Sequence, residues 1–298
     1  MTENAMLTFE QITDINFWKQ LNPKMHITDD DFMKSSKIFT LNNAQKNYIH
    51  SHMQVEGYVQ LSPPDWGDLQ ISEMASLVKT FVAKDIMPVF SFLFDEYWLL
   101  FYKLNEFHQF ILDDDYKLLP DFWCWCVDPM KNESGWKPHR DKGAYSLFPD
   151  KSPMSLSTWI PLTNATTLNG CMYIVPMHLD RGGEENGRFG FELSSIRALP
   201  AEAGSVLIWN QYLYHWGSRT GRDATEPRIS VAFETQRSDV RPFNDFLLNP
   251  LVNVSFNQRL ALIGKQILQY THMYPLAQQY AEIARELVKL GLTEDVKV

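Results

Sequence analysis

The chain has 298 residues, of which 45% are hydrophobic and 21% charged, as in an ordinary globular protein with a sizeable core. Its formal net charge of −9 at pH 7 disfavours a broad nucleic-acid-binding surface, which needs clustered Lys and Arg. Three cysteines are too few for a disulfide framework, so we expect a reducing, cytoplasmic location. We expect neither a signal peptide nor a membrane span, since the most apolar stretch, "MPVFSFLFDEYWLLFYKL", is short and interrupted by two acidic residues.

Helical periodicity dominates the N-terminal part of the chain. Apolar residues recur at roughly helical spacing over 8–21, and residues 41–57 predict a helix that ends near Gly57. A short strand, "YVQL", follows at 58–61, and residues 70–85 predict an amphipathic helix.

The centre of the chain has a different pattern. Short runs of aromatic and branched residues, bounded by Pro, Gly, Asn and Asp, predict strands at 121–128, 155–163, 170–176, 204–210 and 228–236. Such strands are typical of a β-sandwich, jelly roll or small barrel.

The tail is helical again over 255–274 and over 275–291, where Pro275 begins a helix that stops at Gly291. No linker-like stretch separates these regions, so we expect one α+β domain. Its parts are a mainly helical segment 1–118, a β core 119–240 that holds the functional site, and a helical segment 241–298.

The segment "WKPHRDKG" contains His139 and Asp141, which point to the same side if the backbone is extended. Two His and one carboxylate form the iron site of non-haem Fe(II) oxygenases. A second His is expected from a distant strand, and His215, near the end of an apolar strand, is the best candidate. The rival pair is His178 and Asp180. The alternative is a solvated loop in which Asp141 forms a turn.

Other metal-binding residue types are interpreted as structural. Cys124 and Cys126 lie on a strand with Trp123 and Trp125, and no second Cys pair accompanies them, so core packing is the interpretation. The remaining histidines fall in predicted helices, turns or the N-terminal region: His26, His50, His52, His108 and His272.

An oxygenase site also needs an anchor for its co-substrate. If the co-substrate is a dicarboxylate, the planar fork of an Arg is the expected partner. Arg228 opens the strand "RISVAFETQ" shortly after His215, and it shares a strand face with Ser230 and Ala232. We predict that Arg228 is this anchor, with a surface Arg as the alternative.

The segment "STWIPLTNATTLNGCMYIVPMH" resembles the strand-turn-strand signature of the phytanoyl-CoA dioxygenase-like family. "HRD" lies upstream, His215 and Arg228 lie downstream in the family's order, and "HSHMQVEGYVQLSPP" is similar to the family's opening helix and strand. The resemblance covers roughly residues 40–238. It implies a double-stranded β-helix, a variant of the jelly roll or cupin fold, flanked by helices and using Fe(II) and 2-oxoglutarate.

Carried onto this sequence, the resemblance implies that His139, Asp141 and His215 bind the iron. Arg228 would hold the distal carboxylate of 2-oxoglutarate, and Trp159 falls where the family has a Trp beside the co-substrate.

Two positions depart from the family's pattern. Ser218 falls near the small hydroxyl residue that contacts the co-substrate in the family, but Trp216 is inserted between His215 and Ser218. His178 falls at a family position that is not a ligand.

The function predicted from these features is hydroxylation of a small molecule with O2, with succinate and CO2 as co-products. The resemblance implies that halogenases of this fold lack the carboxylate, so Asp141 argues against a halogenase. The alternatives are a cupin-type metabolite-binding protein without oxygenase activity, which gives no reason for Arg228, and an oxygenase of a macromolecule. We expect neither nucleic acid nor a membrane as a partner.

Overall fold

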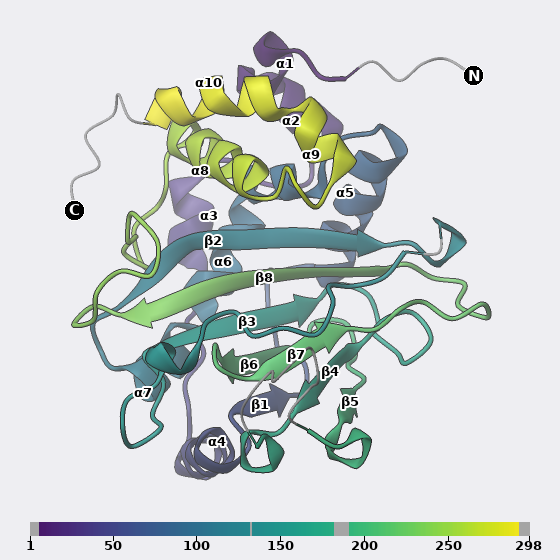
Figure 1. Ribbon diagram of the computed structural model, residues 1–298. Coiled ribbons are helices and arrows are strands. Elements are labelled where there is room, and N and C mark those ends of the chain that lie inside the picture. The colour runs from purple at the N-terminus through teal and green to yellow at the C-terminus, as the bar shows by residue number, and fades with distance from the viewer. Residues whose placement is uncertain (1–5, 132, 182–190, 292–298) are drawn as a thin grey trace.

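The computed structural model describes residues 6–131, 133–181 and 191–291 (Figure 1). The strands are β1 (Tyr58–Leu61), β2 (Tyr116–Val127), β3 (Ser155–Pro161), β4 (Met172–Val175), β5 (Arg197–Leu199), β6 (Val206–Asn210), β7 (Tyr214–Gly217) and β8 (Arg228–Arg237). The α-helices are α1 (Phe9–Thr13), α2 (Ile15–Leu21), α3 (Asp30–Ser35), α4 (Asn43–Val55), α5 (Ile71–Ala83), α6 (Asp95–Lys103), α7 (Asn105–Leu112), α8 (Phe256–Gln269), α9 (Pro275–Gln279) and α10 (Ala281–Gly291). Short 3-10 helices are η1 (Pro88–Leu93), η2 (Pro129–Lys131), η3 (Ala144–Ser146), η4 (Met177–Leu179) and η5 (Leu193–Ser195).

Two antiparallel sheets form the centre of the fold. The larger has the strand order β1-β6-β3-β8-β2 and the smaller has the order β5-β4-β7. Side chains alternate along each strand, so Val206 and Ile208 of β6 join the core on the helix side. Leu207 and Trp209 point the other way and pack against the small sheet. The predicted α+β class is confirmed, and two antiparallel sheets packed in this way fit the expected jelly-roll core.

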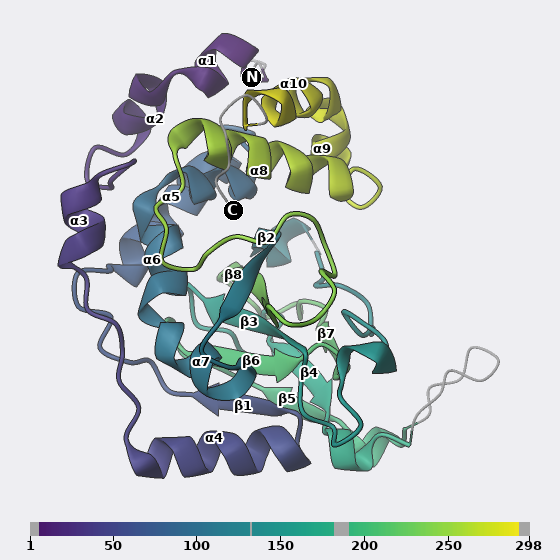
Figure 2. The same cartoon turned by 90° about the vertical axis from the view of Figure 1, so that its left-hand side faces the viewer.

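Helices cover the outer side of the large sheet. The short helix η1 packs against α5, α8 and β2. Figures 1 and 2 both place α8, α9 and α10 beyond the β2 edge of the sheet and α4 beyond the opposite, β1 edge. No described helix is both long and apolar enough to cross a bilayer.

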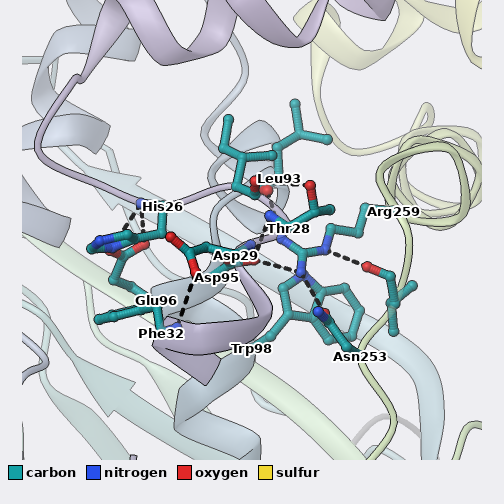
Figure 3. A network of polar contacts seen from close by, with 12 residues as sticks. His26, Thr28, Asp29, Phe32, Leu93, Asp95, Glu96, Trp98, Asn253 and Arg259 are labelled. Carbon is teal, nitrogen blue, oxygen red and sulfur yellow. Dashed lines mark hydrogen bonds and ion pairs between the residues drawn. The ribbon is translucent and has the colours of Figure 1, made fainter. Parts of the chain in front are cut away.

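A buried ion pair joins the N-terminal and C-terminal helical parts (Figure 3). Arg259 of α8 and Asp95 of α6 are both fully buried, with Nη2 and Oδ1 2.6 Å apart. Asp95 also accepts hydrogen bonds from the backbone N–H groups of Thr28 and Asp29, while Arg259 donates to the carbonyl of Leu93. The network therefore fixes α8, whose C-terminal end reaches the functional site.

Most predicted elements are confirmed, with differences at their ends. Residues 8–21 form two helices instead of one, because Asp14 interrupts the first and its carboxylate caps the second by accepting from Asn16 N–H. Residues 275–291 are likewise divided at Tyr280 into α9 and α10. His215 was expected near the end of an apolar strand, and it lies on β7 of the small sheet, which a turn after Asn210 separates from β6.

Candidate metal centre

His139 and His215 lie side by side because their backbones pair. His139 N–H donates to His215 O over 3.0 Å, and His215 N–H donates to His139 O over 2.9 Å. The Nε2 atoms of the two rings lie 3.4 and 3.5 Å from Oδ1 of Asp141. Their candidate ligand atoms all lie within 4.8 Å of one another, and no other group of three such ligands occurs in the described parts of the chain.

Each imidazole is oriented by a backbone carbonyl. Nδ1 of His139 lies 2.7 Å from Lys137 O, and Nδ1 of His215 lies 3.0 Å from Leu213 O. A carbonyl only accepts, so each Nδ1 carries the hydrogen and each Nε2 presents a lone pair towards Asp141. Nε2 of His139 is buried and makes no hydrogen bond within the described residues. This orphaned lone pair is what a metal ligand requires.

Asp141 divides its two oxygens between different partners. Oδ2 accepts from Ser157 Oγ at 2.7 Å and from Trp209 Nε1 at 3.1 Å, while Oδ1 faces the two imidazoles. Gln211 Nε2 in turn donates to Ser157 Oγ over 3.1 Å. These donors fix the carboxylate so that one oxygen is presented to a metal.

The ionised carboxylate of Asp141 suits a divalent cation, which would displace any proton from the imidazoles. Burial alone would raise the pKa of Asp141, but His215, His139 and the Ser157 hydroxyl outweigh burial and hold that pKa below its ordinary value. Burial lowers the pKa of His215, and it would also lower the pKa of His139, but there the nearby Asp141 carboxylate outweighs burial and raises it. A carboxylate and two imidazoles are ligands that Fe(II) and similar first-row metals accept.

Arg228 is a buried cation without a counter-ion. Its side chain is 2% exposed and donates to Ser230 Oγ, but no carboxylate of the described residues lies within ion-pair distance and its Nε has no hydrogen-bond partner. Burial lowers the pKa of Arg228 to about 10, so it remains charged at neutral pH. A buried charge without a counter-ion is unfavourable, so the Arg228 guanidinium favours the binding of an anion.

The metal-ligand triad and Arg228 line one cavity between the two sheets. It is lined by His139, Asp141, His215, Arg228 and Trp159. The Trp159 ring lies 5.7 Å from the Arg228 guanidinium. Five of the six residues predicted for the site therefore face the same cavity.

Ser218 is placed differently from the other predicted residues. Its neighbour Gly217 lines the cavity, but Ser218 does not. The Ser218 Oγ is buried without a hydrogen-bond partner in the described structure, and the hydroxyl that contacts Arg228 is that of Ser230. A contact between Ser218 and the co-substrate therefore stays a prediction.

The rival pair does not form a ligand set. His178 Nδ1 lies 3.8 Å from Glu56 Oε2, and Asp180 Oδ2 lies 2.6 Å from Arg140 Nη2. The segment around Asp141 is not a solvated loop either, because the Asp141 side chain is only 12% exposed.

Several residues that line the cavity were not predicted from the sequence. Glu234 shares the strand face of Arg228, so strand alternation alone was sufficient to place it. Asp121, Trp136 and Tyr270 come from a strand bulge, a loop and the end of α8, and no local pattern marks them as parts of one site.

Residues 65–223, more than half of the chain, match the family profile described as phytanoyl-CoA dioxygenase (PhyH). The chain belongs to the phytanoyl-CoA dioxygenase family. The resemblance in the sequence is thus confirmed, and with it the expectation of a dioxygenase-family enzyme. No curated protein matches the chain.

Solved structures with this fold include other enzymes that use 2-oxoglutarate (alpha-ketoglutarate). The non-haem epimerase SnoN from nogalamycin biosynthesis has a TM-score of 0.52 at 14% identity, over 70% of this chain and 96% of SnoN. The carbocyclase SnoK from the same biosynthesis gives 0.51 at 13%, over 72% of this chain and 100% of SnoK. HygX from Streptomyces hygroscopicus, with nickel and 2-oxoglutarate bound, gives 0.50 at 13%, over 69% and 90% of the two chains. At such identities the similarity of this phytanoyl-CoA dioxygenase family member to them is one of fold.

Proposed function

We propose that the protein is an Fe(II)- and 2-oxoglutarate-dependent dioxygenase that hydroxylates a small molecule. The observation that carries the proposal is a single cavity that holds a metal-ligand triad and the unpaired buried cation of Arg228. A plain metabolite-binding protein has no reason to combine the two. SnoN was crystallised with Fe3+ and alpha-ketoglutarate, and HygX with nickel and 2-oxoglutarate, which supports the same pair of ligands here.

The roles follow from the positions of the side chains. His139, His215 and Asp141 would hold Fe(II), while Arg228, with Ser230 beside it, would bind the distal carboxylate of 2-oxoglutarate. When bound, Fe(II) and 2-oxoglutarate supply the oxidising chemistry, in which O2 places one oxygen atom in succinate, formed with loss of CO2, and the other in the substrate hydroxyl.

The protein's own contribution is orientation and exclusion of water. Ser157 and Trp209 hold the Asp141 carboxylate, the backbone carbonyls hold both imidazoles, and Trp159 packs near Arg228. A site of fixed ligands in an aromatic cavity keeps bulk water from competing with the substrate. Because Asp141 is present as a ligand, we favour hydroxylation over halogenation.

We also propose that residues 1–298 act as one oxygenase domain and that the protein works in a reducing, cytoplasmic setting. The free thiols of Cys124, Cys126 and Cys171 support this location.

The test is an anaerobic titration with Fe(II) and 2-oxoglutarate, monitored by the weak visible charge-transfer band of the chelate. We expect the band in the wild type, its loss in His139→Ala, and a large rise in the 2-oxoglutarate concentration needed to form it in Arg228→Met. His178→Ala is the matched control, because His178 lies outside the triad.

Absence of the band in the wild type would refute the proposal. A band that persists in His139→Ala but disappears in His178→Ala would show that the metal binds elsewhere.

A further inference from the structure

The cavity has a second polar end. Arg228 and Glu234 lie six residues apart on the same face of β8, and both line the cavity. Six residues of an extended strand span about 20 Å, so Glu234 lies far from the carboxylate-binding end. Asp121 of β2 lines the cavity at the Glu234 end.

A bulge in β2 brings Asp121 to this position. Leu118 pairs with Thr235 and Phe122 with Phe233, so the residues between them on β2 face Glu234 alone. The backbone groups released by the bulge are satisfied by the fully buried Gln266 of α8, which donates to Pro120 O and accepts from Phe122 N–H. A bulge braced in this way re-aims a side chain at a defined point.

Asp121 is buried with half of its carboxylate unused. The residue is 4% exposed, and Oδ2 accepts from Asn244 Nδ2 at 2.6 Å. Oδ1 is buried without a hydrogen-bond partner, and Asp121 makes no ion pair within the described chain. Leaving a buried carboxylate oxygen without a donor is unfavourable, so this atom calls for a donor from a ligand.

The cations around this end leave Asp121 Oδ1 without a donor. Lys142 Nζ lies 3.2 Å from Glu234 Oε2, so its ion pair is with Glu234 and not with Asp121. Lys265 Nζ donates instead to Asn244 Oδ1, at 2.7 Å, and to the backbone carbonyl of Asp245. Burial raises the pKa of Glu234 to about 8, so Asp121 is the principal negative charge at this end. Both lysines act on Asp121 from a distance, but neither donates to its Oδ1.

Aromatic rings enclose the same space. Trp123 and Trp136 lie 4.6 and 5.2 Å, centroid to centroid, from the ring of Tyr270, and all three line the cavity. Burial, reinforced by Glu234 and Asp121, raises the pKa of Tyr270, so its phenol is neutral. Electron-rich ring faces beside a carboxylate are the surroundings that a protein offers to an organic cation.

We propose that the substrate carries a protonated amine, and that this group binds at the Asp121–Glu234 end of the cavity by donating to Oδ1 of Asp121. This inference rests on the proposed function, because only an oxygenase would make the bound amine a substrate. The amine site itself does not depend on bound metal. The substrate class is a small amine with an apolar body that fits between the Trp and Tyr rings. Oxidation would occur on a carbon held between this end and the metal triad.

The test compares two probes of equal shape, 2-phenylethylamine and 2-phenylethanol, by calorimetric titration of the full-length, metal-free protein at pH 7.5. Metal-free protein is used because an amine could otherwise bind the metal. We expect the amine to bind at least tenfold more tightly than the alcohol in the wild type. In Asp121→Asn, and in Asp121→Ser should the first variant not fold, the ratio should fall to within about threefold.

The matched control is Asp68→Asn, which removes an exposed carboxylate outside the cavity and should keep the tenfold preference. A wild-type ratio below tenfold, failure of both probes to bind, or a preference that survives in the cavity variants would overturn the inference.

The chelate band of the wild type separates the two proposals. A band without an amine preference removes only the substrate class, and an amine preference without a band removes only the oxygenase.

Discussion

Ser157 donates its hydroxyl to Oδ2 of Asp141 over 2.7 Å, which turns the other carboxylate oxygen, Oδ1, towards His139 and His215. The bond joins the large sheet, which carries Ser157 on β3, to the loop that carries Asp141. The orientation of the triad is therefore set by a residue that is itself no metal ligand.

Ser157→Ala should weaken metal binding because the carboxylate loses its best-placed donor. We expect Fe(II) affinity to fall about 10- to 100-fold, as is typical when a hydrogen bond to a metal ligand is removed, with the fold retained. Anaerobic Fe(II) titration measures the effect. Ser155→Ala is the matched control, because Ser155 lies on the same strand and its buried Oγ has no partner in the described structure. Equal losses in both variants would contradict the role of Ser157.

Gly217→Ala should impair 2-oxoglutarate binding more than metal binding. A Cβ at position 217 would lie 2.9 Å from Gly135 Cα and 3.2 Å from Arg228 Nη2, so the methyl group would displace the guanidinium or the backbone. We expect a KM for 2-oxoglutarate at least several-fold higher, and a loss of stability of about 1–3 kcal/mol from overpacking. Gly221→Ala is the control, since its added Cβ meets nothing closer than 3.5 Å. An unchanged KM would show that the Arg228 end tolerates the methyl group.

His139, Asp141 and Arg228 were predictable because each carries a local signal. His139 and Asp141 are two apart in an extended segment, and Arg228 begins an apolar strand whose alternation fixes its face. Their convergence was not readable from spacing. It depends on the pairing of His139 with His215, which joins residues 76 positions apart in the chain. Only the family resemblance of the sequence predicted it.

At the opposite end of the cavity, strand alternation could place Glu234 but not Asp121. Asp121 reaches this end through a bulge that the register of β2 with β8 creates, and Gln266 braces that bulge from α8. Neither residue belongs to a local pattern, because a bulge depends on which strand becomes the partner. The same reason explains why β7 was missed as a separate strand.

Asp95→Asn should destabilise the fold strongly. It would leave Arg259, which is fully buried, without its anionic partner, and removing one member of a buried pair typically costs about 3–5 kcal/mol. Urea unfolding of the two proteins gives the difference. Glu286→Gln is the control, because the exposed pair of Lys289 with Glu286 has side chains 67% and 56% exposed and should change stability by less than about 0.5 kcal/mol. A loss below about 1 kcal/mol in Asp95→Asn would show that the pair does not hold the helical layers together.

His108 should make stability depend on pH below neutrality. Its ring is fully buried, with Nδ1 3.0 Å from Leu104 O and Nε2 2.9 Å from Thr158 Oγ1, and burial lowers the pKa of His108 to about 4. The unfolded chain binds a proton at this residue with a pKa of about 6.5, so acid favours unfolding. The stabilisation is complete above about pH 6.5 and is lost as the pH falls towards 4, by about 3 kcal/mol in total.

Replacing His108 with Gln, which keeps a group able to bond Thr158, should remove this slope. Urea unfolding of the metal-free protein between pH 4.5 and 7.5 should therefore give a flatter curve for His108→Gln than for the wild type. His50→Gln, at an exposed position on α4, should leave the wild-type slope in place. Because the wild type and His108→Gln share every other titrating group, the difference between their curves isolates His108. Parallel curves for wild type and His108→Gln would mean that the buried ring is protonated in the folded state without cost.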